Sequence, residues 1–216
     1  MTDTPAAVEA ALRSLFPTGV AVAVEPIVPT GADRLWPKER PAVAGAVPAR
    51  LAEFVAGRSA ARRALAALDQ PQQALPMAAD RAAIWPAGIS GSIAHAAGLA
   101  VAVARRGDAP LGVDIEDDTA IAPDLWAILC GPAELQRLTG DRGKGVKRLF
   151  CAKEAVFKAQ APDRRAMFGH EMLTVTLAGD RFDASFLGDA GAFRAGQVVR
   201  GRIAVAAGRV LAGVAV

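Results

Sequence analysis

The 216-residue sequence has no tyrosine, only two cysteines and only two histidines. Two cysteines, Cys130 and Cys151, are too few for a disulfide framework or a cysteine-based zinc site, and they favour a reducing compartment. No apolar run is long enough to cross a bilayer, and residues 1–11 lack the basic leader and apolar core of a secretory signal. We therefore expect a cytoplasmic protein without a membrane span.

Neither sign of charge dominates, since the formal net charge is only +3. Residues 1–106 hold 11 basic and 8 acidic side chains, whereas residues 107–216 hold 14 of each. The excess of positive charge in the first half predicts an anionic partner there, either a nucleotide, a nucleic acid or an acidic protein. The overall charge does not choose among the three, but because no basic patch is interleaved with aromatic residues, we expect no nucleic-acid partner.

The pattern of apolar residues predicts both helices and strands, in either one large domain or two small ones. We expect long helices at 6–16, 49–68 and 149–159, one or two helices within 122–138, and a charged turn at 140–145. The expected strands are 20–24, 91–95, 99–104, 111–116, 173–177, 182–186, 201–206 and 210–216. Each half holds one long helix and several strands, which is compatible with a duplicated architecture.

The helix predicted at 149–159, which we expect Pro162 to end, contains the most informative pair of charges. Glu154 and Lys158 lie one helical turn apart between two apolar flanks. A carboxylate in such a position is costly unless it is paired, hydrogen-bonded or bound to a cation. The alternative is an ordinary ion pair on a solvated stripe of the helix.

The strand predicted at 111–116 carries two carboxylates on one face. Strand alternation sends Val113 and Ile115 to one side and Asp114 and Glu116 to the other. Two adjacent carboxylates repel each other. Solvent can screen this repulsion at the surface, whereas in a cleft a bound cation is needed to offset it. Oxygen ligands of this kind suit magnesium. Two further aspartates follow, so a merely acidic loop is the competing interpretation.

The helix predicted at 49–68 places Arg58 and Arg62 within its apolar arc, whereas Glu53 and Arg63 point the other way. These two arginines either extend from the edge of the core or project into a cleft and hold phosphate, for which a guanidinium is well suited. Arg50, two turns before Arg58, could join them in a phosphate site.

Both histidines are isolated in the sequence. His95 lies at the bend between the strands at 91–95 and 99–104, after the turn marked by Trp85 and Pro86. His170 has no recognisable setting. Taken alone, His95 is expected to be structural, and His170 is expected to lie at the surface or in the core.

Four stretches, taken in order, resemble one family. They are Arg50 with EFVAGRSAAR at 53–62, Trp85-Pro86 with GSIAH at 91–95, GVDIE at 112–116, and LFCAKEAVFKA at 149–159. Together they span about half of the chain. In their order and spacing they resemble the 4'-phosphopantetheinyl transferase superfamily, in its long single-chain form of the enterobactin synthase component D type.

The resemblance implies an α+β fold of two similar halves in a pseudo-twofold arrangement, with the active site in the cleft between them. Residues 1–106 would form the N-terminal half and bind the phosphates of coenzyme A. Residues 107–216 would form the C-terminal half and carry the metal-binding and catalytic residues.

The resemblance also implies a reaction, in which the 4'-phosphopantetheine arm of coenzyme A is transferred to a serine of an apo carrier protein, releasing adenosine 3',5'-bisphosphate. Asp114, Glu116 and Glu154 would bind Mg²⁺, with Mn²⁺ as an alternative. Glu154 would act as the base towards the serine hydroxyl, directly or through water. Lys158 would hold a phosphate oxygen, and Lys153 would assist it.

The same resemblance assigns coenzyme A binding, principally of the 3'-phosphate, to Arg50, Arg58 and His95. Arg81 is a weaker match to a basic residue that precedes the Trp-Pro turn, and Arg62 is interpreted as structural support. Ala94 stands where the family usually has Ser or Thr, so a hydroxyl contact to the coenzyme is expected to be absent.

The expected partners are coenzyme A and an acyl or peptidyl carrier protein of siderophore, polyketide or fatty-acid synthesis, and a monomer is expected. Two alternatives remain open at this point. A magnesium-dependent nuclease would use the same carboxylates, although such enzymes usually place their Glu-x-Lys pair on a strand. A noncatalytic nucleotide-binding module would bind coenzyme A without Glu154 and form no product.

Overall fold

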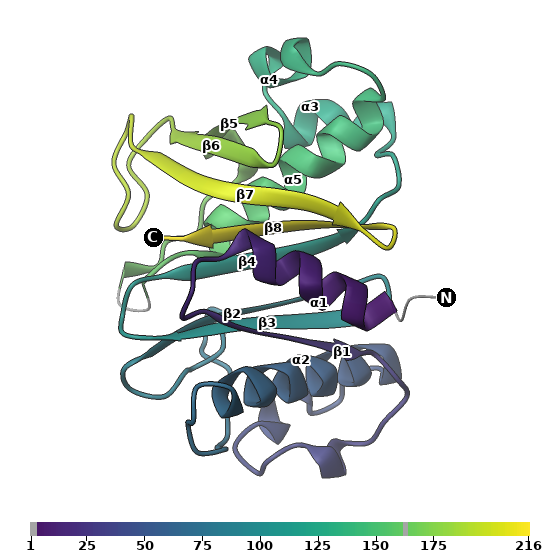
Figure 1. The fold of residues 1–216 in the computed structure, drawn as a ribbon, viewed down its shortest axis with the longest axis vertical. Coiled ribbons are helices and arrows are strands. Elements are labelled where there is room, and N and C mark those ends of the chain that lie inside the picture. The colour runs from purple at the N-terminus through teal and green to yellow at the C-terminus, as the bar shows by residue number, and fades with distance from the viewer. Residues whose placement is uncertain (1–3, 162–163) are drawn as a thin grey trace.

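A computed structural model describes residues 4–161 and 164–216 of the chain. The described residues form two antiparallel sheets, each covered by one long helix (Figure 1). The predicted α+β class is confirmed. No helix in these two segments is both long enough and apolar enough to span a membrane.

The first sheet has three strands in the order β1-β3-β2, namely β1 (Ala21–Pro26), β2 (Ile89–Ala96) and β3 (Leu99–Arg106). The predicted hairpin between β2 and β3 is confirmed, and its turn residues Ala97 and Gly98 both have positive φ angles. Helix α2 (Pro48–Ala66) packs across this sheet and begins one residue before the predicted start, with proline at its first position.

The second sheet has five strands in the order β4-β8-β7-β6-β5. All five were expected from the alternation of apolar residues, and they are β4 (Leu111–Asp117), β5 (Leu173–Ala178), β6 (Arg181–Phe186), β7 (Val198–Ala206) and β8 (Arg209–Ala215). Helix α5 (Arg142–Lys158) packs against it. The short elements are η1 (Ala32–Arg34), η2 (Arg40–Val43), η3 (Pro123–Leu125), α3 (Trp126–Leu129), α4 (Pro132–Arg137) and η5 (His170–Met172).

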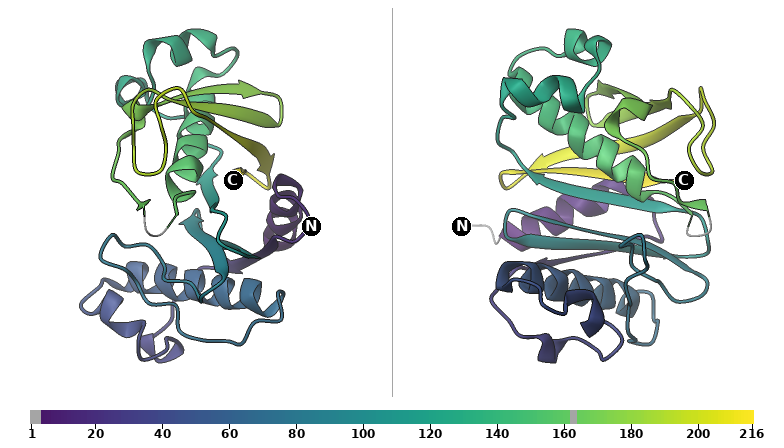
Figure 2. Two further views of the ribbon diagram at one scale, coloured as in Figure 1. Left: turned by 90° about the vertical axis from the view of Figure 1, so that its left-hand side faces the viewer. Right: turned by 180° about the vertical axis from the view of Figure 1, so that it is seen from behind.

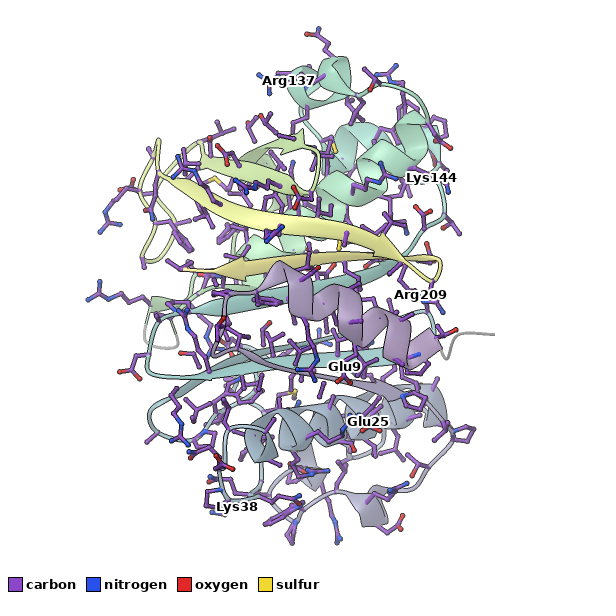
Figure 3. The ribbon with its side chains drawn as sticks, viewed as in Figure 1. Glu9, Glu25, Lys38, Arg137, Lys144 and Arg209 are labelled. Atoms are coloured by element: carbon purple, nitrogen blue, oxygen red, sulfur yellow. The ribbon has the colours of Figure 1, made fainter. Side chains whose placement is uncertain are left out.

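The first helix joins the two sheets into one core. Helix α1 (Thr4–Leu15) buries Val8 and Leu12 among apolar residues of strands from both sheets. Helix α1 lies on one face of β8 (Figure 2). Leu211 belongs to the apolar cluster that contains α1, whereas Val210 and Ala212 belong to the cluster that contains α5. On the other side of α1, Arg63 of α2 pairs with both Glu9 and Glu25, the two acidic residues labelled in this region of Figure 3.

Helix α5 is longer than the sequence suggested. We expected a turn at 140–145, but the helix begins at Arg142, and Asp141 caps it by accepting a hydrogen bond from the backbone N–H of Lys144. The expectation was wrong. Glycine usually disfavours a helix, yet Gly143 and Gly145 both lie within α5. Here Gly143 permits close packing, since a Cβ at this position would lie 2.8 Å from the Cβ of Ala120. The predicted stop at Pro162 lies outside the described residues.

The two sheets meet at β2 and β4, where the backbone N–H of Val113 donates a hydrogen bond to Ser92 Oγ. Helix α5 crosses β4 in close contact at Gly112, where a Cβ would lie only 1.9 Å from the carbonyl oxygen of Ala155. This contact brings the last two turns of α5 directly over β4. It therefore sets the position of Glu154 and Lys158 relative to Asp114.

Candidate active site

A cavity of about 560 Å³ opens between the two sheets, and residues from both halves of the chain line it. In the left view of Figure 2, α2 lies in the lower part of the molecule and α5 in the upper part. Eight of the predicted site residues line the cavity. They are Arg50, Arg58, Arg81, His95, Asp114, Glu116, Glu154 and Lys158.

Among the acidic residues that line the cavity, Asp114 of β4 is the most buried, with 3% of its surface exposed. Lys158 Nζ lies 2.5 Å from Asp114 Oδ1, while Asp114 Oδ2 is buried and has no hydrogen-bond partner. As predicted, Val113 and Ile115 point to the opposite face of β4 and pack in the core with α1. The alternation of this strand is therefore confirmed.

Helix α5 contributes Glu154 and Lys158 to the same side of the cavity. Burial raises the pKa of Glu154, and the nearby charge of Asp114 raises it further, although Lys158 and His170 partly offset this. Burial alone would lower the pKa of Lys158, but Asp114 and then Glu154 reverse the direction, so that this pKa is raised. The alternative of an ion pair on a solvated stripe is wrong, because Lys158 pairs across elements with Asp114.

Glu116, two residues along β4, completes the acidic set. Burial raises its pKa, and repulsion from Asp114 adds to this effect. Lys147 of α5 partly offsets the shift, with its Nζ 3.5 Å from Glu116 Oε2 and 2.9 Å from Asp117 Oδ1. The acidic residues are thus partly buried in the cavity wall, which argues against a merely acidic surface loop.

The donor set fits a hard divalent cation by its chemistry. Three carboxylates line one wall, and Asp114 leaves one buried oxygen without a partner. Burial and repulsion from Asp114 raise the pKa values of Glu116 and Glu154. Within the part of the chain that the structure describes, no three His, Cys, Asp or Glu side chains converge closely enough to form a metal site. Instead, the Lys158 ammonium provides the positive charge beside Asp114.

The opposite wall, formed by α2 and β2, is cationic. Arg50 Nη1 lies 2.8 Å from His95 Nε2 and 3.2 Å from Glu53 Oε2. Because a guanidinium only donates hydrogen bonds, His95 Nε2 is the acceptor and the ring proton is on Nδ1. Burial lowers the pKa of His95, with Glu53 acting against this and Arg50 adding to it. A neutral imidazole beside an arginine is therefore present in this wall.

Arg58 is buried in the same wall. Its Nε donates to the backbone oxygen of Leu75 at 2.6 Å, and its guanidinium lies 4.1 Å from the centre of the Phe54 ring. Burial lowers the pKa of Arg58 to about 10, although Glu39 acts in the opposite direction. Arg58 therefore stays positively charged near neutral pH while lining the cavity.

Arg62 has the structural role that the sequence suggested. It does not line the cavity, and its Nη1 lies 2.9 Å from Oε1 of Glu39, which is completely buried. Glu39 also accepts hydrogen bonds from the backbone N–H groups of Trp36 and Leu75. This network holds the segment that contacts Arg58, so the two arginines of the apolar arc have different roles.

Lys153 requires a correction. We expected it to assist phosphate binding, but it is only 1% exposed and does not line the cavity. Its Nζ donates to Glu134 Oε2 at 2.8 Å and to the backbone oxygens of Leu129 and His170. One position along a helix turns a side chain by about 100°, so Lys153 points into the core while Glu154 faces the cavity.

Glu53 also differs from expectation. We placed it on the side of α2 away from the predicted phosphate site, but it lines the cavity and contacts both Arg50 and His95. The spacing of three residues between Arg50 and Glu53 could have shown that the two share a face of the helix.

Two other residues near the site had no clear signal in the sequence. His170 Nε2 lies 3.8 Å from Glu154 Oε1, and the His170 ring packs edge-on against Phe150. Arg165 forms an ion pair of 3.0 Å with Asp80, which joins the two halves across the cavity lining. Both contacts depend on tertiary packing between segments far apart in the chain.

Most of the chain matches known protein families. Residues 38–105 match the 4'-phosphopantetheinyl transferase N-terminal domain, and residues 110–207 match the 4'-phosphopantetheinyl transferase superfamily. The chain is 36% identical to 4'-phosphopantetheinyl transferase Svp of Streptomyces mobaraensis over 176 residues, covering 78% of this chain and 68% of that protein.

Two further relatives are more distant or shorter in coverage. The chain is 32% identical to 4'-phosphopantetheinyl transferase Npt of Nocardia iowensis, covering 71% of this chain and 76% of the relative. It is 35% identical to enterobactin synthase component D of Escherichia coli K12, covering 59% of this chain and 63% of the relative.

Proposed function

The chain belongs to the 4'-phosphopantetheinyl transferase superfamily and has that enzyme activity, and we propose that its central cavity transfers the phosphopantetheine arm of coenzyme A to a serine of an apo carrier protein. Adenosine 3',5'-bisphosphate is the other product. The observation that carries this proposal is that one cavity brings together three carboxylates, Lys158 and a cationic wall from the two halves.

We propose that the reacting phosphorus of coenzyme A lies beside the wall that carries the three carboxylates. Asp114, Glu116 and Glu154 would hold Mg²⁺, which when bound offsets the charge of the pyrophosphate. The buried, unpartnered Oδ2 of Asp114 supports this assignment. Mn²⁺ has the same preference for oxygen ligands and is the alternative metal.

Glu154 is the proposed general base. Its carboxyl lines the cavity and has a pKa raised by burial, which brings its proton affinity closer to neutral pH and suits it to accept the serine proton. The serine oxygen forms a new bond to the phosphorus that bears pantetheine, while the bond from this phosphorus to the bridging oxygen of the pyrophosphate breaks. The bridging oxygen leaves with adenosine 3',5'-bisphosphate.

The cationic side chains are proposed to bind and orient the coenzyme. Lys158 would hold a phosphate oxygen near the reacting centre, because its raised pKa keeps it charged. Arg50, Arg58 and His95 would bind the 3'-phosphate and neighbouring phosphates on the opposite wall, with Arg81 as an additional contact. Both walls come from one chain, which supports a monomer as the active form.

The alternatives identified from the sequence are less favoured. The Lys153-Glu154 pair lies within helix α5, whereas the nuclease alternative would place such a pair on a strand. Both halves of the chain match transferase families. A noncatalytic binding module would form no product, and this difference is directly measurable.

The test is intact-mass spectrometry of apo carrier proteins incubated with this protein, coenzyme A and Mg²⁺. The expected result is addition of one phosphopantetheine group to a peptidyl or acyl carrier, abolished by a chelator and by replacement of the carrier serine with alanine. Coenzyme A binding without product across all carrier types would contradict the proposed transfer.

A further inference from the structure

The cationic wall already contains an anion that belongs to the chain. Glu53 Oε2 lies 3.2 Å from Arg50 Nη1 and 3.7 Å from His95 Nδ1, which are two of the groups assigned above to coenzyme phosphate. Arg50 and His95 are themselves only 2.8 Å apart. The three side chains thus form a closed cluster in the free protein.

The position of Glu53 allows it to be displaced. Its side chain is 33% exposed, and it contacts Arg50 from the next turn of the same helix. An ion pair of this exposure contributes little to stability, because solvent screens it. A phosphate group carries roughly one and a half to two negative charges near neutral pH and offers three acceptor oxygens, whereas a carboxylate carries one charge. Phosphate therefore competes effectively with Glu53 for Arg50.

We propose that Glu53 is an exchangeable counterion, which neutralises Arg50 in the free enzyme, gives way to the 3'-phosphate of the coenzyme, and returns when adenosine 3',5'-bisphosphate leaves. This inference rests on the proposed function, since it takes the phosphate site as given. It adds a role for a residue that would otherwise be assigned only to structural support of α2. The consequence is faster release of the bisphosphate product.

The experiment compares native protein with Glu53→Gln, which removes the charge and keeps the shape. Titration calorimetry measures the dissociation constants of adenosine 3',5'-bisphosphate and adenosine 5'-monophosphate, which differ only in the 3'-phosphate. We expect the bisphosphate to bind about threefold more tightly to Glu53→Gln, the equivalent of one partly exposed ion pair, while the monophosphate is unaffected. Inhibition of transfer by the bisphosphate should strengthen by the same factor.

Glu25→Gln is the matched control. Glu25 pairs with Arg63 of α2 at 2.9 Å and is partly exposed, but it does not line the cavity, so this variant should bind both nucleotides like the native protein. In an Arg50→Gln background, Glu53→Gln should give no gain, because the competed cation is absent.

Failure of the inference is distinguishable from failure of the proposed function. Native protein that modifies a carrier and prefers the bisphosphate, with no gain for Glu53→Gln beyond that of Glu25→Gln, would overturn the counterion role alone. Weaker bisphosphate binding by Glu53→Gln would overturn it too, and would show that Glu53 holds Arg50 in its binding position. Native protein that binds neither nucleotide nor coenzyme A would overturn both.

Discussion

Lys158 of α5 and Asp114 of β4 form an ion pair across the floor of the cavity, with Nζ 2.5 Å from Oδ1. Asp114 is almost completely buried, and its other carboxylate oxygen has no hydrogen-bond partner. The ammonium of Lys158 is therefore the positive charge that makes this buried carboxylate tolerable in the free protein. With the roles proposed above for Lys158 and Asp114, this pair would link substrate binding, metal binding and stability.

Replacing Lys158 with methionine is expected to reduce transfer by about a hundredfold, as expected when one charged contact to the reacting phosphate is lost. The same change leaves Asp114 without its partner, so Mg²⁺ should raise the melting temperature more in Lys158→Met than in native protein. Thermal unfolding with and without Mg²⁺ measures this effect. In the double variant Asp114→Asn/Lys158→Met the additional response should disappear. An equal Mg²⁺ response in native and Lys158→Met proteins would contradict the assignment of Asp114 as a metal ligand.

Replacing Glu154 with glutamine is expected to abolish transfer while coenzyme A still binds. The amide has the size of the carboxyl group, but it neither accepts the serine proton nor supplies a negative charge to the metal. Intact-mass spectrometry of the carrier measures transfer, and calorimetry measures coenzyme A binding. The control is Glu171→Gln, because Glu171 lies in η5, is exposed and does not line the cavity; this variant should retain activity. Near-native turnover by Glu154→Gln would exclude Glu154 as both base and ligand.

The sequence predicted the elements of this fold well, because strand alternation and hairpin turns are local properties. The strands at 111–116 and 210–216 were recognised within one residue at either end. The start of α5 was missed, because the reason for a glycine at position 143 is its close packing against Ala120, which is distant in sequence. Local preference predicted a turn at this position, and tertiary packing produced a helix.

The candidate site was predictable where a motif fixed it and less so where packing did. The resemblance identified eight residues that line the cavity. It did not distinguish Lys153 from Lys158, because both belong to the same motif and only the direction of each side chain separates them. The contact between Glu154 and His170 joins α5 to η5. The spacing of these two residues in the sequence does not predict that their side chains lie close together.

The buried ion pair between Lys153 and Glu134 leads to a prediction about stability and not about binding. Lys153→Met would leave the buried Glu134 carboxylate without its ammonium, although it keeps the backbone donors of Gly131 and Val175. We expect a loss of about 3 to 5 kcal/mol in the free energy of unfolding, measured by urea denaturation. While folded, the variant should bind coenzyme A within about twofold of the native affinity.

Lys144→Met is the control for this experiment. Lys144 pairs with Asp118 at 2.9 Å but is substantially exposed, and Figure 3 shows it at the surface near the start of α5. Its replacement should cost less than about 1 kcal/mol. Equal losses for the two variants, or a large loss of coenzyme A affinity in folded Lys153→Met, would contradict the structural role of Lys153.

The raised pKa of Glu154 predicts how its replacement affects stability at different pH values. The ordinary pKa of 4.5 applies to the unfolded chain, and burial raises the pKa in the folded chain, so the folded protein holds a proton that the unfolded chain releases. The stability contributed by the protonated carboxyl is complete below pH 4.5 and is lost as the pH rises through the folded pKa. In the presence of a chelator, Glu154→Gln should therefore be more stable than native protein at pH 7, and the gain should shrink towards pH 4.5.

Asp180→Asn should behave oppositely, because a hydrogen bond from Arg202 lowers the pKa of Asp180, so its charged form stabilises the fold above its unfolded pKa. Urea denaturation at both pH values measures these differences, and a Glu154→Gln variant less stable than native protein at pH 7 would show that its attraction to Lys158 exceeds the cost of burying its charge.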